Sequence, residues 1–159
     1  RHLVKALGAQ RVTVSDVVSD AVAFAQQALG AAGFVSTARP QDLAWPQRHD
    51  VVFVLSLFSH LPRATWGAWL ARLWDMVAPG GVLVYETFAQ GNETVGRPAR
   101  PEFLLAPGEL LHVCKDLRVV GYEDGFIDEP ARFVQRITAV RELPQAGGPS
   151  RHLLPTGAS

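Results

Sequence analysis

An unbroken apolar run from Val51 to Leu55 restricts the possible folds more than any other feature of the sequence. A strand that is apolar at every position, rather than at alternate positions, is typical of a parallel sheet that is covered on both faces. Residues 66–77 then carry apolar side chains at helical spacing, and Ala78-Pro-Gly-Gly81 ends that helix before a second apolar run, Val82–Tyr85. A strand, an amphipathic helix and a further strand in this order predict two parallel strands joined by a helix.

The remaining segments continue this alternation of strands and helices. The sequence therefore predicts an α/β fold, with a mostly parallel sheet, helices on both faces and a closing antiparallel strand. Pro, Gly and Ser dominate from residue 143 onward, so we expect one domain over residues 1–142 and a disordered tail over residues 143–159. The other expected strands are 11–16, 34–38, 117–122 and 132–140, and the other expected helices are 3–7, 20–29 and a short one from Pro107.

The balanced charge and the single cysteine indicate which binding partners and which cellular compartment to expect. The 15 Lys and Arg residues equal the 15 Asp and Glu residues, and basic side chains form no cluster, so nucleic acid and anionic membrane surfaces are poor partners. The longest nearly unbroken apolar stretch, Val51–Phe58, is much shorter than the ~20 residues of a bilayer-spanning helix. Cys114 has no second cysteine to pair with, which suits a reducing compartment. We therefore expect a cytoplasmic protein that binds neither nucleic acid nor membrane.

The ends of the expected strands select the candidate functional residues. In an open α/β sheet, ligands bind beyond the carboxyl ends of the strands. This rule selects Asp16, the loop Arg39–Trp45, the segment Ser56–His60, and Glu86 with the loop that follows it. Asp50 begins a strand, so we place it at the opposite edge.

Asp16 is the most specific of these candidates. A carboxylate at the end of a strand in a nucleotide-binding sheet can accept hydrogen bonds from both hydroxyls of a ribose. The alternative is that Asp16 only caps the turn that follows it. The loop Gly91–Pro101 is polar and too long for a tight turn, so it is a candidate substrate loop or lid.

Three stretches, Arg11–Asp16, Asp50–Leu55 and Val77-Ala-Pro-Gly-Gly-Val-Leu-Val84, resemble the class I S-adenosylmethionine-dependent methyltransferases. In that family they correspond to the strand with the ribose-binding acid, the central fourth strand and the "L-x-P-G-G" start of the fifth strand. The resemblance implies a Rossmann-like fold. Further segments look like a bacterial small-molecule subgroup related to the tellurite-resistance methyltransferases: 85–92, 96–98, 103–105, 107–110, 122–125 and 134–137.

The resemblance implies methyl transfer from S-adenosylmethionine to a small-molecule acceptor, with no metal. His60 and Glu86 are the titratable candidates for taking a proton from the acceptor. The alternatives are a surface histidine at a helix start for His60 and a hydrogen-bonded supporting residue for Glu86. Asn92 and Arg97 are the candidate acceptor contacts, with a solvated loop as the competing interpretation. The cofactor-binding candidates are Asp16, Asp42, Leu43 and Ser56, where Asp42 stands near the acid that in the family contacts the adenine amino group.

One family feature has no counterpart in this sequence. In the family, a first strand and a glycine-rich loop precede the position of Arg1. We therefore expect that first strand upstream of Arg1, between the strands 11–15 and 51–55 in the sheet, and we expect the fragment alone to be inactive.

Two other functions remain open at this point. A nicotinamide-dependent Rossmann oxidoreductase also uses a strand-end acid, but the closing strand 132–140 and the lack of a Tyr-x-x-x-Lys pair favour the methyltransferase. A non-catalytic binding module with the methyltransferase fold is the third interpretation.

Overall fold

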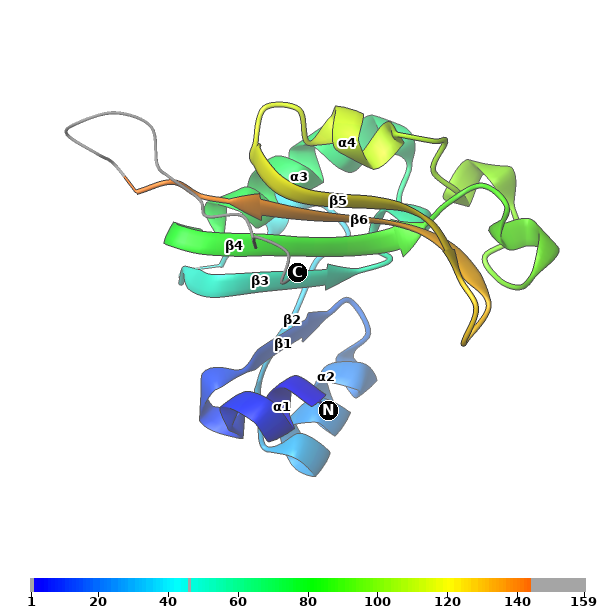
Figure 1. Ribbon diagram of the computed structural model, residues 1–159. Coiled ribbons are helices and arrows are strands. Elements are labelled where there is room, and N and C mark those ends of the chain that lie inside the picture. Colours follow the sequence, from blue (N-terminus) through cyan, green and yellow to red (C-terminus); the bar gives the residue numbers. More distant parts are fainter. Residues whose placement is uncertain (1, 46, 144–159) are drawn as a thin grey trace, which may run out of the picture. The chain divides into compact units, whose positions relative to one another are not determined.

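The computed structural model describes residues 2–45 and 47–143 (Figure 1). The expected disordered tail falls almost entirely outside these residues. The chain divides into two compact units, Arg1–Trp45 and Pro46–Ser159, and this division falls inside the single domain expected for residues 1–142.

The first unit is a small parallel α/β layer. It consists of α1 (His2–Leu7), β1 (Thr13–Asp16), α2 (Ser19–Leu29) and β2 (Ala32–Val35). The strands β1 and β2 pair in parallel, and Asp16 lies opposite Val35 at their carboxyl ends. Helix α2 packs closely on β2, because a Cβ atom on Gly33 would lie only 2.6 Å from Val22 Cγ1. Both strands are shorter than the sequence predicts.

The second unit contains a four-stranded sheet in the order β3-β4-β6-β5 (Figure 1). Strands β3 and β4 are parallel, whereas β6 is antiparallel to both β4 and β5. The predicted closing antiparallel strand is therefore confirmed. The strands span His49–Leu55 (β3), Val77–Phe88 (β4), Arg118–Ile127 (β5) and Arg132–Val140 (β6).

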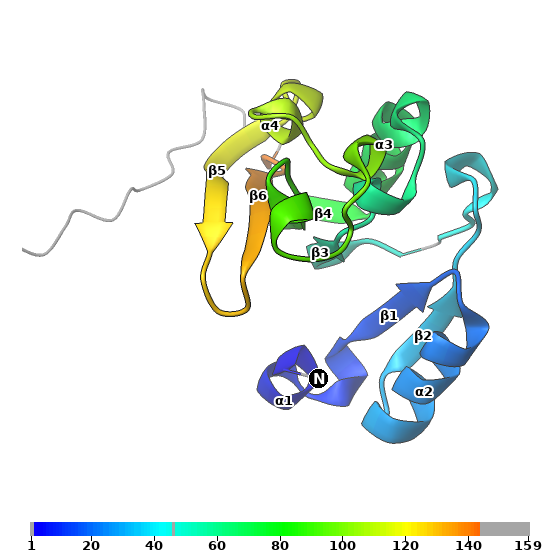
Figure 2. The ribbon, with the colours of Figure 1, turned by 90° about the vertical axis from the view of Figure 1, so that its right-hand side faces the viewer.

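Helices α3 (Trp66–Asp75) and α4 (Glu109–Val113) lie on the same face of this sheet (Figure 2). The predicted helical stripe is buried at Trp66, Trp69, Leu70 and Leu73. The sheet contributes the opposing side chains, which include the fully buried Leu83, Tyr85, Ile137 and Ala139. The core of the second unit therefore lies between α3, α4 and one sheet face.

The other face of β3 differs from the expectation of burial on both sides. Val52 and Val54 are buried, but Val51, Phe53 and Leu55 are 52%, 48% and 57% exposed. The physical reason is that both described helices of this unit cover the same sheet face. The apolar run therefore predicts the strand correctly, but its prediction that both faces of the strand are buried is wrong.

The Pro-Gly-Gly segment also differs from the expectation. Helix α3 ends at Asp75, and β4 begins at Val77, so Pro79, Gly80 and Gly81 lie within the strand rather than in a turn. The pairing of β3 with β4 shifts register between His49 and Val51. Gly81 permits this irregularity, because a Cβ atom there would lie 2.8 Å from the carbonyl oxygen of Asp50.

Candidate active site

In the first unit, Asp16 and the loop after β2 share the carboxyl edge of the two-stranded sheet. The Asp16 carbonyl oxygen accepts a hydrogen bond from Ser36 N at 2.7 Å, so the loop starts beside Asp16. The Asp16 side chain is exposed, and its Oδ1 accepts a hydrogen bond from Val18 N at 2.9 Å. The carboxylate thus caps the turn before α2, and its exposed position also leaves it accessible to a ligand.

In the loop after β2, Asp42 is exposed and the next residue, Leu43, is buried. Asp42 ends a 3₁₀ turn, Pro40–Asp42, and is exposed, whereas Leu43 is 5% exposed. The Trp45 ring packs edge-on against Phe34, with ring centroids 5.0 Å apart. Leu43 is therefore buried, whereas the adjacent Asp42 is exposed to solvent.

In the second unit, Ser56 directly follows β3 in an unusual backbone conformation. Its φ is 54°, and no other non-glycine residue that the structure describes has a positive φ. Such a conformation costs of order 1–3 kcal/mol and persists only where the surroundings hold it. Ser56 N donates to Glu86 O at 2.7 Å, and Ser59 Oγ donates to Ser56 O at 2.6 Å. The segment beyond β3 is therefore strained and firmly bonded.

Within the segment Ser56–His60, Phe58 is buried in the core, whereas His60 is exposed to solvent. Phe58 is fully buried and stacks on Trp66 with centroids 4.8 Å apart and ring planes within 7° of parallel. Phe58 N donates to the Tyr85 hydroxyl oxygen at 2.6 Å. His60 ends the 3₁₀ turn Phe58–His60, and its side chain is exposed. The burial of Phe58 therefore fixes the backbone next to His60, which lies just beyond the end of β3.

Glu86 lies near the end of β4, on the sheet face opposite Tyr85. Its carboxylate accepts a hydrogen bond from Arg136 Nε at 2.5 Å and lies 3.7 Å from Arg132 Nε. Arg136 also contacts Glu123 at 3.1 Å, and its hydrogen bond to the Glu86 carboxylate raises the pKa of the Arg136 guanidinium. The two guanidinium groups occupy the Glu86 oxygens, and this geometry favours the supporting role over proton transfer.

Asn92 and Arg97 occupy very different environments in the loop after β4. Asn92 is 2% exposed; its Nδ2 donates to Pro98 O at 3.0 Å and its Oδ1 accepts from Phe133 N at 3.2 Å. The Asn92 amide therefore fastens the loop to β6, which favours a structural role. Arg97 is exposed and is free of that constraint.

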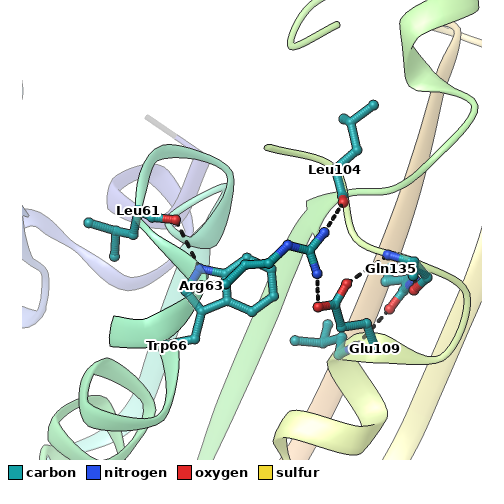
Figure 3. A network of polar contacts seen from close by, with 8 residues as sticks. Leu61, Arg63, Trp66, Leu104, Glu109 and Gln135 are labelled. Atoms are coloured by element: carbon teal, nitrogen blue, oxygen red, sulfur yellow. Dashed lines mark hydrogen bonds and ion pairs between the residues drawn. The ribbon is translucent and has the colours of Figure 1, made fainter. Parts of the chain in front are cut away.

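A polar network that the sequence does not predict joins the far end of this loop to the helices (Figure 3). Arg63 donates to the Glu109 carboxylate and, at 2.8 Å, to Leu104 O. The fully buried Gln135 accepts from Leu110 N at 2.9 Å and donates to Ala106 O at 2.7 Å. A glutamine at an inward position of β6 is the only sequence signal for this network, and it does not identify the partners.

Cys114 is fully buried, and burial raises the pKa of its thiol to about 12, so it remains protonated at neutral pH. Among residues 2–45 and 47–143, no group of three or more His, Cys, Asp or Glu side chains is arranged to hold a metal ion. Within the same residues, no helix is long and apolar enough to cross a membrane.

Several solved structures with a similar fold are methyltransferases. NodS, an N-methyltransferase from Bradyrhizobium japonicum, superposes with a TM-score of 0.62 at 18% identity, over 83% of this chain and 74% of NodS. The 1,6-didemethyltoxoflavin-N1-methyltransferase from Burkholderia thailandensis, solved with S-adenosylhomocysteine bound, gives 0.62 at 18% identity over 87% of this chain and 64% of the enzyme. These likenesses establish the Rossmann-like α/β fold.

TehB from Haemophilus influenzae also shares the fold, with a TM-score of 0.62 at 17% identity over 86% of this chain. The chain spans about half of TehB, 51% of its length. No protein-family model and no curated protein matches the sequence.

Proposed function

We propose that this chain is a domain of an S-adenosylmethionine-dependent methyltransferase that acts on a small-molecule acceptor. The observation that carries the proposal is Asp16, an exposed carboxylate at the carboxyl end of β1 in a methyltransferase-like fold. One of its oxygens is held by Val18 N, so the carboxylate has a fixed orientation for accepting hydrogen bonds from ribose hydroxyls.

Asp42, Leu43 and Ser56 are the further residues that we propose for cofactor binding. Asp42 is exposed and would accept a hydrogen bond from the adenine amino group, and Leu43 fixes the position of Asp42 through burial. Ser56 is the proposed contact in the second unit, because its strained backbone is held at the end of β3. Within the first unit, Asp16 and Asp42 fit the polar edges of a nucleoside, because carboxylates accept hydrogen bonds from hydroxyl and amino groups.

The proposed reaction needs alignment more than covalent help. S-adenosylmethionine supplies a methyl group on a sulfonium, which the acceptor attacks in line while the carbon–sulfur bond breaks and its electron pair passes to sulfur. His60 is our candidate for removing the acceptor proton, because it is exposed at the sheet edge. Glu86 is assigned a supporting role because Arg132 and Arg136 engage its carboxylate.

The acceptor class and the subgroup rest on separate grounds. A subgroup related to the tellurite-resistance methyltransferases is supported by the similarity of segments within residues 85–110 and 122–137 to bacterial small-molecule enzymes. A small-molecule acceptor is also consistent with the fold neighbour that binds 1,6-didemethyltoxoflavin. Arg97, exposed in the loop after β4, is the proposed contact for an acidic or polar acceptor.

Calorimetric titration of the protein expressed from its complete gene tests the cofactor. We expect binding of S-adenosylhomocysteine and no binding of NADH, and the reverse result would favour the oxidoreductase. Transfer of a labelled methyl group to small thiols, phenols, amines or carboxylates then tests the activity. Binding without transfer to any acceptor class would favour the non-catalytic binding module.

A further inference from the structure

The segment Ser56–His60 depends on a side chain that lies outside it. Tyr85 lies on β4, and its fully buried ring contacts Phe58, which in turn stacks on Trp66 of α3. Its hydroxyl oxygen accepts the hydrogen bond from Phe58 N at 2.6 Å, and this contact joins two points 27 residues apart in the chain. Because Phe58 is itself fully buried, its N–H has no route to solvent if this acceptor is removed.

From this geometry we propose that Tyr85 is a positioning residue, whose hydroxyl holds Ser56–His60 in the conformation that the cofactor and acceptor require. This inference rests on the proposed methyltransferase function. Tyr85 itself contacts neither ligand in this proposal.

The strain at Ser56 explains why the segment needs such a tether. A serine at φ 54° relaxes toward the extended or helical regions unless neighbouring contacts oppose it. Ser59 Oγ bonds Ser56 O at 2.6 Å from within the segment, and Ser56 N is bonded to β4 at Glu86 O. The Tyr85 hydroxyl adds a third attachment, to a side chain in the core. Together these bonds fix the backbone between Ser56 and His60.

The hydroxyl is separable from the packing of the Tyr85 ring. The ring meets Phe58 edge-on, with centroids 4.7 Å apart and planes at 73°, and a phenylalanine at this position keeps that contact. Burial raises the pKa of the Tyr85 hydroxyl, so it remains neutral and cannot act as a base at neutral pH. Its role is therefore to accept the Phe58 hydrogen bond, and Tyr85→Phe removes that role with little change of shape.

The consequence for catalysis lies in the two residues at the ends of the segment. Ser56 is the proposed cofactor contact and His60 the proposed base, and both take their positions from the backbone that Phe58 anchors. Displacement of a reacting or orienting group by about 1 Å can lower a rate by about 100-fold. A loosened segment is therefore expected to affect binding and turnover more than global stability.

The test compares Tyr85→Phe with Tyr122→Phe in the protein expressed from its complete gene. Tyr122 is the matched control, because its hydroxyl bonds the exposed Asp124 at 3.2 Å on β5. Hydrogen exchange is followed in the peptide that covers residues 56–61, and S-adenosylhomocysteine affinity is measured by calorimetry well below the melting temperature. For Tyr85→Phe we expect about tenfold faster exchange in that peptide, unchanged exchange in β6, and about tenfold weaker binding. Ser59→Ala is a second variant, expected to act in the same direction by loss of the Ser56 bond.

The outcomes distinguish a failure of this inference from a failure of the function on which it rests. Unchanged exchange in residues 56–61 of Tyr85→Phe, or faster exchange with unchanged affinity and turnover, overturns the positioning role alone. An equal loss of affinity in Tyr122→Phe also overturns it, because the effect is then not specific to the segment. If the unsubstituted protein binds no S-adenosylhomocysteine, the proposed function fails and the positioning role fails with it.

Discussion

At the scale of single residues, local bonds decide what each candidate side chain is free to do. Asp16 uses one oxygen to cap a turn yet remains exposed, whereas the Asn92 amide and the Glu86 carboxylate are engaged by neighbours. The sequence predicts which residues lie at the strand ends, because strand order follows from apolar periodicity. It does not predict these bonds, since Asn92 and Glu86 each have a partner on β6, far along the chain.

Asp16 can be tested with a matched pair of substitutions. Asp16→Asn keeps an oxygen for Val18 N, so we expect near-normal stability but S-adenosylmethionine binding weakened by about 1.5–3 kcal/mol, the range for hydrogen bonds to a charged group. Asp16→Ala also loses the hydrogen bond from Val18 N and should unfold about 1 kcal/mol more easily. Calorimetry and chemical denaturation measure the two effects. Unchanged affinity in both variants would remove the ribose assignment.

Cys114 gives a prediction about alkaline stability. Its pKa is raised from 9.0 to about 12 by burial, so above about pH 9 the unfolded chain releases a proton that the folded chain retains. Stability should fall as the pH rises from 9 toward 12, by at most about 1.4 kcal/mol per pH unit from this group. Cys114→Ala should show a shallower fall in denaturation experiments. At pH 8 the thiol of the folded chain should resist a thiol-reactive dye; rapid labelling would contradict its burial.

At the scale of elements, the β3–α3–β4 segment shows what periodicity can and cannot predict. The helical stripe at residues 66–73 and the two strands lie where the apolar pattern places them. The Pro-Gly-Gly segment forms part of β4, because Gly81 meets the backbone of β3 too closely for any side chain. Close approach between two backbones leaves no trace in hydrophobic periodicity, so glycines that end a helix and glycines that permit contact look alike.

Two glycines on either side of this boundary should respond oppositely to alanine. A Cβ atom at Gly81 meets backbone oxygens of Asp50 and Ala78 at 2.8 and 2.9 Å, so Gly81→Ala should destabilise the fold by about 1–3 kcal/mol. A Cβ atom at Gly67, exposed within α3, meets nothing within 4 Å. Gly67→Ala should therefore stabilise the fold by about 0.5–1 kcal/mol through helix propensity. Thermal or urea denaturation measures both, and equal effects would contradict the close approach.

The loop after β4 should govern the choice of acceptor. Its ends are tied, because Gln90 N and Leu105 N bond Leu105 O and Phe88 O, while Arg97 at its middle is exposed. We expect Arg97→Ala to raise the Michaelis constant for an acidic acceptor about tenfold and leave that for S-adenosylmethionine nearly unchanged. Arg100→Ala, which changes an exposed arginine paired with Glu102 in the same loop, serves as the control. Equal changes in both Michaelis constants would argue against an acceptor role.

At the scale of the whole molecule, the order of elements was predictable, whereas the coverage of the sheet was not. The closing antiparallel strand follows from the pattern of residues 117–140 and appears in the structure as β5 and β6. Apolar residues at every position from Val51 to Leu55 indicate that something packs on each face, but periodicity does not identify what does so. In the structure, Val51, Phe53 and Leu55 are exposed, although the apolar pattern predicts that they are buried.

The expected strand between residues 11–15 and 51–55 stays a prediction with a direct test. Among the described residues, no strand pairs with the outer edge of β3, and β1 pairs only with β2. Each buried amide without a partner costs about 1–3 kcal/mol. A chain extended upstream by such a strand should therefore melt at least about 5 °C above the 159-residue chain and bind S-adenosylmethionine more tightly. Equal melting temperatures and affinities would contradict the expected strand.

The charged side chains of β4, β6 and β5 also constrain the alignment of these strands. Glu86, Arg136 and Glu123 lie side by side on one sheet face, while their neighbours Tyr85 and Ile137 face the helices. A slip of one residue in β6 would turn Arg136 into the apolar layer and Ile137 into solvent. These three charged side chains therefore make a misaligned sheet energetically costly, and they protect the antiparallel strands against slippage during folding.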